Sequence, residues 1–241
     1  MLDLTEKLLQ SHPIYNGRII RVRSDEVLLP DGGHGLREGV DHPGGVGILA
    51  LDDKGQVALV RQYRYAVGEH LWEIPAGKRE KGEEPRITAR RELHEEVGAD
   101  AERWTDLGTL IASPGCYAER LYLYKAEGLT FTRQQLDEDE FLEVRFFPFE
   151  EVVEKCLSGQ LQDAKTVAAV LKGKVDLSAE KARLEKEIAA AQKELAGCEK
   201  TLANEGFVAK AAPAVVQKKR DRAAELKEIL AALTAQVADF S

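Results

Sequence analysis

Residues 77–99 of this 241-residue chain read GKREKGEEPRITARRELHEEVGA, and this stretch decides the fold. Pro85 suits the first turn of a helix, and Gly98 suits the position just past the end of that helix. Leu93 and Val97 are four residues apart, so they lie on one side of the helix and can pack against a core. The stretch therefore predicts one helix that begins near Pro85 and ends at Gly98.

Three glutamates of this stretch share a neighbouring face of the predicted helix. Glu92, Glu95 and Glu96 are spaced i, i+3 and i+4, which brings their carboxylates together. Because like charges on one face repel, the segment loses helix stability unless a cation binds there. Oxygen-only ligands on a rigid helix suit Mg²⁺ or Mn²⁺ better than zinc. Without further context, a solvated acidic face is the ordinary interpretation of such a helix.

The residues around the helix follow a spacing that resembles the Nudix box. Gly77 is followed after five residues by Glu83, and after seven more by residues 91–99, RELHEEVGA. This resemblance implies a loop–helix–loop that holds divalent metal ions against a diphosphate. It also implies that Arg91 braces the helix by pairing with a loop carboxylate such as Glu83.

The same resemblance gives roles to the residues of the motif. The framework positions are Gly77, Glu83, Arg91 and Gly98. The metal ligands are Glu92, Glu95, Glu96 and the carbonyl of Ala76, with Glu95 and Glu96 also counted as catalytic.

Composition limits the classes of protein to consider. The chain is 44% hydrophobic and 32% charged, which suits one sizeable domain with an appendage. A net charge of −8 gives no general indication of nucleic-acid or membrane binding. Cys116, Cys156 and Cys198 are far apart and odd in number, which favours a reducing compartment over a disulfide framework or zinc site. The first ten residues lack the pattern of a signal peptide, and no apolar run approaches the ~18 residues of a membrane span, so we expect a soluble cytoplasmic protein.

Charge and aromatic content divide the chain near Lys174. Residues 176–241 carry 11 Lys and Arg against 11 Asp and Glu, so residues 1–175 hold the whole net charge of −8. The aromatic residues are concentrated in the first two-thirds of the chain. We therefore predict an N-terminal β-meander over residues 1–43, a Nudix-like domain over residues 44–174 and a helical hairpin over residues 175–241.

The N-terminal segment reads as short strands broken by turns. The predicted strands are Arg18–Val22, Glu26–Leu29 and Leu36–Val40, with a turn at residues 30–33. Such a meander is too small to bury its own core, so it must pack on the next domain or on another subunit. The family resemblance implies a homodimer with exchanged N-terminal sheets, in which Arg37 of one subunit lies near the substrate of the other.

The central part of the chain is rich in strand patterns. Candidate strands are Gly44–Leu51, Gln56–Tyr63, Leu71–Pro75, Trp104–Ile111, Arg120–Ala126 and Glu143–Pro148, and short amphipathic helices are predicted at Glu150–Ser158 and Ala164–Leu171. Mixed strands around one acidic helix, with helices closing the end, predict an α+β sandwich. The Nudix resemblance implies the same α/β/α layering over residues 1–174.

Arg64 ends a predicted strand and leads towards residues 72–77, WEIPAG. Strand alternation places Arg61 and Arg64 on opposite faces, and surface arginines are the ordinary interpretation of both. In the Nudix family an arginine at the place of Arg64 meets substrate phosphate, a role that suits the planar guanidinium group. The resemblance accordingly assigns Arg64 and Glu73 to substrate binding.

Pro114 lies in a Ser-Pro-Gly sequence that by itself indicates only a turn. It stands sixteen residues beyond Gly98, and in the Nudix family a proline about this far past the box marks the ADP-ribose pyrophosphatase branch. Residues 60–78, VRQYRYAVGEHLWEIPAGK, and residues 137–144, DEDEFLEV, resemble the same branch. Residues 116–118 depart from what usually follows this turn. The resemblance implies that Pro114 contributes to the substrate pocket.

An acidic run, Asp137-Glu138-Asp139-Glu140, precedes the last predicted strand. Such a run is ordinarily a solvated loop. In ADP-ribose pyrophosphatases the matching loop lies over the metal ions and brings the general base. The resemblance assigns that base to Glu138 and a further metal contact to Glu140.

The last part of the chain has heptad periodicity in two arms. The repeated positions are Leu184, Ile188, Ala191, Leu195, Cys198 and Leu202, followed by Ala223, Leu226, Leu230, Leu233, Val237 and Phe240. An antiparallel coiled-coil hairpin is the simplest structure with this pattern.

The connection between the arms resembles the C-terminal coiled-coil arm of valyl-tRNA synthetases, which contacts tRNA. The likeness lies in residues 201–216, TLANEGFVAKAAPAVV, and a basic cluster follows at residues 218–222, KKRDR. Binding of tRNA through residues 200–222 is one interpretation. Packing or self-association is the other, because basic patches are usually solvated faces.

These observations predict an enzyme that uses Mg²⁺, or alternatively Mn²⁺, to hydrolyse the diphosphate of ADP-ribose to AMP and ribose 5-phosphate. Another nucleoside diphosphate sugar or a dinucleotide is the alternative substrate. A tRNA-binding adaptor is the alternative outside the enzyme class. The complete set of carboxylates favours the enzyme, since a binding module needs no metal site.

Overall fold

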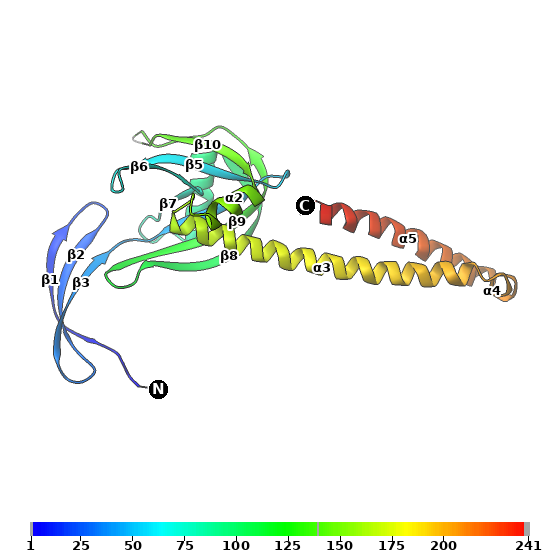
Figure 1. Ribbon diagram of the computed structural model, residues 1–241, viewed down its shortest axis with the longest axis horizontal. Coiled ribbons are helices and arrows are strands. Elements are labelled where there is room, and N and C mark those ends of the chain that lie inside the picture. The colour runs from blue at the N-terminus through cyan, green and yellow to red at the C-terminus, as the bar shows by residue number, and fades with distance from the viewer. Residues whose placement is uncertain (1, 139, 239–241) are drawn as a thin grey trace. The chain divides into compact units, whose positions relative to one another are not determined.

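The computed structural model describes residues 2–138 and 140–238, so Asp139 and Phe240 of the patterns above lie outside the described residues. The chain divides into two compact units, Met1–Gly173 and Lys174–Ser241 (Figure 1). No helix in the described part of the chain has the length and apolar character needed to cross a membrane.

The first unit begins with an antiparallel three-stranded sheet. Its strands are β1 (Lys7–Asn16), β2 (Arg21–Leu28) and β3 (His34–Asp41). The predicted strand at Arg18–Val22 begins too early: Arg21 and Val22 belong to β2, but residues 17–20 form the turn between β1 and β2, closed by the Gly17 N–H bond to the Ile20 carbonyl at 2.9 Å. Strand β1 was missed because Pro13 interrupts its pattern, and a proline is tolerated in β1 since it is an edge strand with a register shift after that residue.

Strand β3 joins this N-terminal sheet to β9 of the central sheet. The N–H of Val40 donates to the carbonyl of Cys116 at 2.7 Å, and Val40 pairs with Tyr117 in parallel register. Several large apolar side chains of the sheet and its turns are exposed: Leu8, Leu9, Ile14, Tyr15, Ile19 and Leu36. A sheet of this size with apolar residues in solvent needs another surface to cover it.

The central sheet has the order β3-β9-β4-β5-β10. Its main strands are β4 (Gly45–Leu51), β5 (Gln56–Arg64), β9 (Tyr117–Phe131) and β10 (Leu142–Pro148). Strand β9 runs parallel to β4, whereas β10 runs antiparallel to β5. The remaining strands β6 (Glu69–Glu73), β7 (Ala76–Lys78) and β8 (Ala99–Ser113) pair with β5, β4 and β9 respectively.

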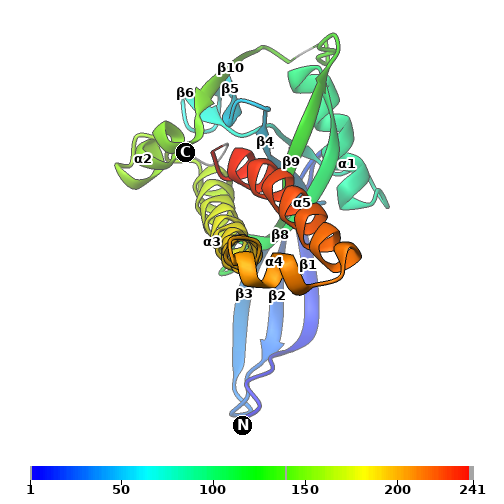
Figure 2. The same ribbon diagram turned by 90° about the vertical axis from the view of Figure 1, so that its right-hand side faces the viewer.

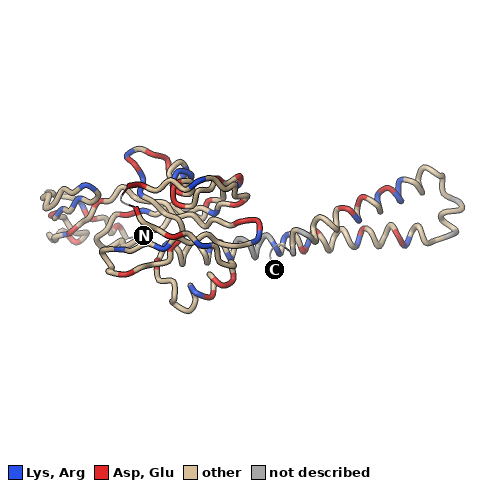
Figure 3. The backbone as a smooth tube through the Cα atoms, turned by 90° about the horizontal axis from the view of Figure 1, so that it is seen from above, with Lys and Arg blue, Asp and Glu red and all other residues tan. Residues whose placement is uncertain are grey.

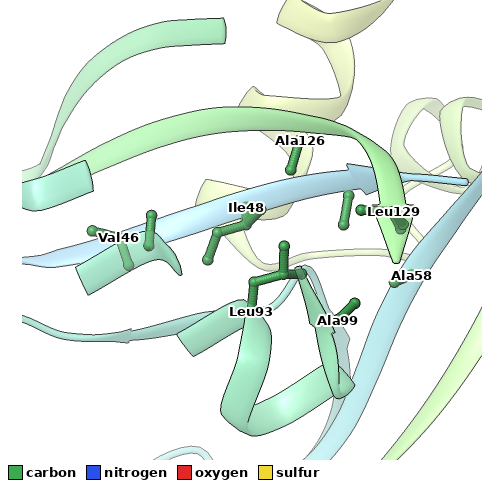
Figure 4. Packing of buried hydrophobic residues seen from close by; sticks show 9 residues of the cluster. Val46, Ile48, Ala58, Leu93, Ala99, Ala126 and Leu129 are labelled. Carbon is green, nitrogen blue, oxygen red and sulfur yellow. The ribbon is translucent and has the colours of Figure 1, made fainter. Parts of the chain in front are cut away.

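Helices cover both faces of this sheet (Figure 2). On one face, Val46 and Ile48 of β4 pack against Leu93 in a buried cluster that also contains Ala89 (Figure 4). On the other face lie α2 (Phe149–Leu157) and the beginning of α3 (Ala164–Leu202), where a Cβ at Gly173 would overlap the side chain of Leu49. The predicted α+β sandwich with helices on both sides is therefore confirmed.

The second unit is the predicted antiparallel helical hairpin. Helix α3 continues through Leu202, the short α4 (Glu205–Lys210) makes the turn, and α5 (Pro213–Ala238) returns along α3 (Figure 1). A cluster of predicted heptad residues lies between the two long helices: buried Cys198, Ala223 and Leu226 with partly buried Ala191, Leu195 and Leu202.

The predicted end of a helix at Leu171 is wrong, because α3 runs from Ala164 to Leu202 without interruption. Gly173 lies within this helix and does not end it. Its lack of a side chain allows the close approach of Leu49. One helix therefore contributes to both units of the chain.

Candidate active site

The acidic segment forms one helix with an irregular second half. Helix α1 (Pro85–Glu92) begins at Pro85, as predicted, and is followed by a π-helical turn, η1 (Leu93–Val97). Gly98 ends it in the left-handed conformation with φ of 66°. The π turn differs from the regular helix expected from the sequence, and such single turns are frequent at functional sites.

Two of the glutamates lie against strand β7. The Ala76 N–H donates to Oε2 of Glu96 at 2.9 Å, and the Glu96 side chain is buried. The carboxyl group of Glu92 occupies the space beside Gly77 that a Cβ would need, so only glycine fits at that position. Strand β7 thus holds Glu96 by a hydrogen bond and Glu92 by close contact.

Arg91 holds the outer edge of the acidic group. Its guanidinium group lies 3.3 Å from Oε1 of Glu83, and its Nη1 lies 2.8 Å from carboxylate oxygens of both Glu92 and Glu95. The structure therefore brings Arg91 to the loop residue Glu83, and it also makes Arg91 the shared counter-ion of two glutamates.

Burial raises the pKa of Glu92 to about 7, and it raises the pKa of Glu96 well above its usual value. The pKa of Glu140 is also raised, first by burial and then by the nearby charge of Asp137. Glu140 is close enough to raise the pKa values of Glu92 and Glu96 further. Burial is therefore the main cause of all three shifts, and the neighbouring carboxylates add to it.

The donor set fits a hard divalent cation, because all candidate ligands are oxygens and their crowded charges favour a cation between them. Among the described residues, no three Asp, Glu, His or Cys side chains are already gathered at chelating distance. Arg91 holds Glu92 and Glu95, and the Ala76 N–H holds Glu96. Metal binding would therefore require these carboxylates to exchange partners.

Loop residues 132–135 are hydrogen-bonded to the end of this helix. The N–H of Thr132 donates to the Gly98 carbonyl at 2.6 Å, and the N–H of Gln135 donates to the Glu95 carbonyl at 3.0 Å. Nε2 of Gln134 donates to the Glu96 carbonyl at 2.5 Å. The sequence analysis missed these contacts, since no local pattern reveals which distant backbone a glutamine meets.

The same loop carries the acidic run. Glu138 is exposed, whereas Glu140 is partly buried and electrostatically coupled to Glu92, Glu95 and Glu96. The structure therefore brings Glu140 to the acidic helix, and it places Glu138 two residues away on the solvent side.

Arg64 and Glu73 form an ion pair next to the carboxylates, with Glu73 buried and Arg64 partly exposed. Nε and Nη2 of Arg64 lie 2.7 and 2.8 Å from the two carboxylate oxygens of Glu73. Only 2% of the Glu73 side chain is exposed, so in this structure it supports Arg64 and is not open to a ligand. Lys165, which the sequence analysis did not select, also pairs with Glu73.

Pro114 and Arg37 lie apart from the acidic group within one chain. Pro114 is exposed in the turn between β8 and β9, close to the place where β3 joins β9. Arg37 lies on the N-terminal sheet, where its Nε and Nη2 donate to the Glu6 carboxylate at 2.9 and 2.5 Å. Neither residue is brought to the carboxylates by the fold of one chain.

Comparison with known families agrees with this architecture. The NUDIX domain family matches residues 41–170, and the nucleoside diphosphate sugar hydrolase N-terminal domain matches residues 6–40. The valyl tRNA synthetase tRNA binding arm matches residues 176–241.

Individual relatives cover the first unit. The chain is 40% identical over 185 residues to an ADP-ribose pyrophosphatase of Bacillus subtilis, which covers 75% of this chain and all of that protein. It is 40% identical over 167 residues to a methanol dehydrogenase activator of Bacillus methanolicus, covering 68% of this chain and 90% of that protein. A crystal structure of an ADP compounds hydrolase shares the fold, with a TM-score of 0.65 at 22% identity over 73% of this chain and 95% of that one.

The chain therefore belongs to the Nudix family. Within that family it is a pyrophosphatase of the nucleoside diphosphate sugar type, with the N-terminal domain that accompanies such hydrolases.

Gly98→Ala should destabilise the protein by about 3 kcal/mol, because a Cβ there combines an unfavourable positive φ with overlap against the docked loop. The new Cβ would stand 2.6 Å from the backbone nitrogen of Gln134. Chemical denaturation and hydrogen exchange at the Gln135 amide measure the two effects.

Gly82→Ala is the matched control. Gly82 also has a positive φ, of 82°, but nothing lies within 4 Å of its Cβ position. Its substitution should cost only about 1 kcal/mol from the backbone conformation. Equal losses for the two variants would contradict the close approach of the loop to Gly98.

Proposed function

We propose that this chain hydrolyses the diphosphate of ADP-ribose to AMP and ribose 5-phosphate in a Mg²⁺-dependent reaction. The observation that carries the proposal is the crowded, partly buried group of carboxylates beside β7, with Arg64 next to it. The proposal is supported by 40% identity to a protein named ADP-ribose pyrophosphatase along that protein's whole length. GDP-mannose pyrophosphatases at 32–34% identity make another nucleoside diphosphate sugar the alternative substrate.

The residues that would hold the metal are Glu92, Glu95, Glu96 and Glu140, with the carbonyl of Ala76. When bound, Mg²⁺ or Mn²⁺ neutralises the diphosphate and lowers the pKa of an attacking water. Because Arg91 pairs with Glu92 and Glu95 and the Ala76 N–H donates to Glu96, these carboxylates would have to leave those partners to bind the ion.

The protein groups would divide the remaining work. Glu138 would take the proton of the attacking water as that water forms its bond to phosphorus, because its exposed position lets it approach from the loop. Arg64 would steady the phosphate oxygens as the leaving phosphate gains charge. Arg91 would keep the helix and the Glu83 loop together without touching substrate.

A second copy of the chain would complete the substrate site. The exposed apolar residues of the N-terminal sheet need a covering surface, and exchange of these sheets in a homodimer would supply it. In that arrangement Arg37 of one subunit, now paired with Glu6, would approach the substrate of the other together with the turn at Pro114.

Glu96→Gln should lower kcat for ADP-ribose by about 10³-fold, because it removes one charged metal ligand and with it several kcal/mol of transition-state stabilisation. The hydrogen bond from the Ala76 N–H can be kept by the amide oxygen of glutamine, so the unfolding temperature should stay within a few degrees of wild type. Chromatography of the nucleoside monophosphate released (AMP, or GMP from GDP-mannose) on a panel of ADP-ribose, GDP-mannose, NADH and Ap4A gives both rate and substrate choice. Wild-type preference for another panel member would reject ADP-ribose as substrate.

Glu138→Gln should lower kcat by about 10²–10⁴-fold with little change in KM, as expected for loss of a general base. Steady-state kinetics at saturating Mg²⁺ separates the two constants. Glu102→Gln, at an exposed glutamate on β8, is the control for loss of one surface charge. An unchanged kcat for Glu138→Gln would move the base to another residue of the loop.

A second activity, binding of tRNA, is proposed for the hairpin because the tRNA binding arm family matches residues 176–241. Acidic and basic residues alternate along both long helices (Figure 3). Arg222 is held by the Glu194 carboxylate at 2.8 and 3.0 Å, which leaves the adjacent residues 218–220, KKR, as the cationic surface for phosphates.

Replacement of Lys218, Lys219 and Arg220 by alanine should weaken tRNA binding and reduce its salt dependence by about two to three units of log K per log salt, since three phosphate contacts are lost. Hydrolysis of ADP-ribose should not change. Filter binding from 50 to 200 mM salt measures the slope. The control removes three cations from the other arm: Lys181, Lys186 and Lys193. Equal effects of both triple variants would show charge-driven association without a site.

A further inference from the structure

Four charged side chains form a chain of alternating sign beside the acidic helix. Arg64 makes two bonds to Glu73, Glu73 also pairs with Lys165, and Nζ of Lys165 lies 3.0 Å from Oδ1 of Asp163. The members come from β5, β6 and the beginning of α3, so the network ties three elements together. We call Arg64, Glu73, Lys165 and Asp163 the Arg64 network.

Arg64 is the most exposed member of the Arg64 network. The exposed fractions of the side chains are 2% for Glu73, 11% for Lys165 and 17% for Asp163, against 38% for Arg64. Both carboxylate oxygens of Glu73 and two of the three guanidinium nitrogens of Arg64 are engaged within the network. The N–H groups of Nη1 and the second N–H of Nη2 are therefore the donors that Arg64 can offer to a ligand.

The charged groups that influence Arg64 show which residues lie near it. The hydrogen bonds to Glu73 are the main cause that raises the pKa of Arg64, and the charges of Glu96 and Asp163 raise it further. Arg64 in turn offsets part of the rise that burial causes in the pKa values of Glu96 and Glu140. The open end of the network thus lies beside the candidate metal ligands, where a diphosphate would be held.

The beginning of α3 is fixed in place by bonds that do not involve charge alone. Oδ2 of Asp163 accepts from the Thr166 N–H at 2.9 Å and from the Thr166 hydroxyl, so Asp163 caps the helix. Oγ1 of Thr166 accepts from the N–H of Ile74, the residue after Glu73, at 2.9 Å. Lys165 is therefore held opposite Glu73 by the backbone on both sides.

The charges explain why a second cation is needed. The Arg64 network has a net charge of zero, with two cations and two anions. Without Lys165 it would carry a net charge of −1 close to the phosphate-binding nitrogen of Arg64. Without Lys165, the buried Glu73 carboxylate would also lose one of its partners. Its orientation would then change, because an unpaired buried carboxylate oxygen is unfavourable and would bond to another donor.

We propose that Lys165 is a positioning residue for the substrate: it holds Glu73 in place and cancels the charge of Asp163, so that Arg64 faces the diphosphate with its full positive charge. This inference rests on the proposed hydrolase function. It assigns a site role to a lysine in the first turn of α3, outside the Nudix motif, and makes Glu73 the link between Lys165 and Arg64.

Lys165→Met keeps the length of the side chain but removes its charge. It should raise KM for ADP-ribose and Kd for α,β-methylene ADP-ribose, which cannot be hydrolysed, by about tenfold, as expected for one nearby uncompensated charge. The change in kcat should stay within about twofold, because the lysine does not touch the reacting atoms. Lys165→Arg should restore most of the affinity.

Two further variants separate positioning from a purely structural role. In an Arg64→Ala background, Lys165→Met should have no additional effect on Kd, because Lys165 acts through Arg64. Asp163→Asn keeps the helix cap but removes the negative charge, so it should leave KM unchanged or lower it. Lys172→Met is the control on the same helix, since Lys172 donates to the Leu107 carbonyl and has no contact with the network.

An unchanged KM and Kd for Lys165→Met would overturn the inference, and so would an equal loss of affinity in the Arg64→Ala background or after Asp163→Asn. If Lys172→Met weakens binding as much as Lys165→Met, the effect is one of helix stability and the inference also fails. A wild-type chain that neither binds the analogue nor cleaves ADP-ribose would reject the proposed function together with this inference. Wild-type activity with an inert Lys165 would reject the inference alone.

Discussion

The structure of the first unit depends on holding several carboxylates close together where water is partly excluded. Burial and mutual repulsion raise the pKa values of Glu92, Glu96 and Glu140, which is the physical cost of this arrangement. Arg91 offsets part of it by pairing with two glutamates, and the N–H of Ala76 offsets another part. The surrounding fold therefore holds these carboxylates in an electrostatically unfavourable arrangement. A divalent cation bound between them would reduce that unfavourable energy.

Two glycines make this arrangement sterically possible, each by admitting a different group. At Gly77 the admitted group is the carboxyl of Glu92, which lies where a Cβ would be. At Gly98 it is the backbone of the loop at Gln134, and the helix also needs a positive φ there. Each of the two glycines thus allows one close approach in space. This gives a steric reason for both motif positions that does not depend on the chemistry of the reaction.

The sequence predicted the parts of the fold that local patterns determine. The helix from Pro85 to Gly98, the central strands and the heptads of the hairpin follow from periodicity and from helix-end residues. It failed where tertiary contacts override those patterns. Gly173 does not end α3, because its missing side chain serves packing on Leu49. Strand β1 tolerates Pro13 because it is an edge strand. The π turn and the role of Lys165 could not be predicted, since both depend on groups that are distant in sequence.

The charges around the site separate into two halves, and this separation bears on how one pocket can serve both a cation and an anion. The acidic half lies on α1, η1 and the loop with Glu140, whereas the cationic half is Arg64, which is supported from β6 and α3. If Arg64 were free, it would collapse onto the nearest unpaired glutamate and neutralise a metal ligand. Because Glu73 holds the Nε and Nη2 edge of Arg64, the guanidinium group stays beside the carboxylates. Glu73, a buried anion with two cationic partners, therefore keeps Arg64 separate from the nearby acidic residues. The site can then offer carboxylates to the metal ion and a guanidinium group to the diphosphate.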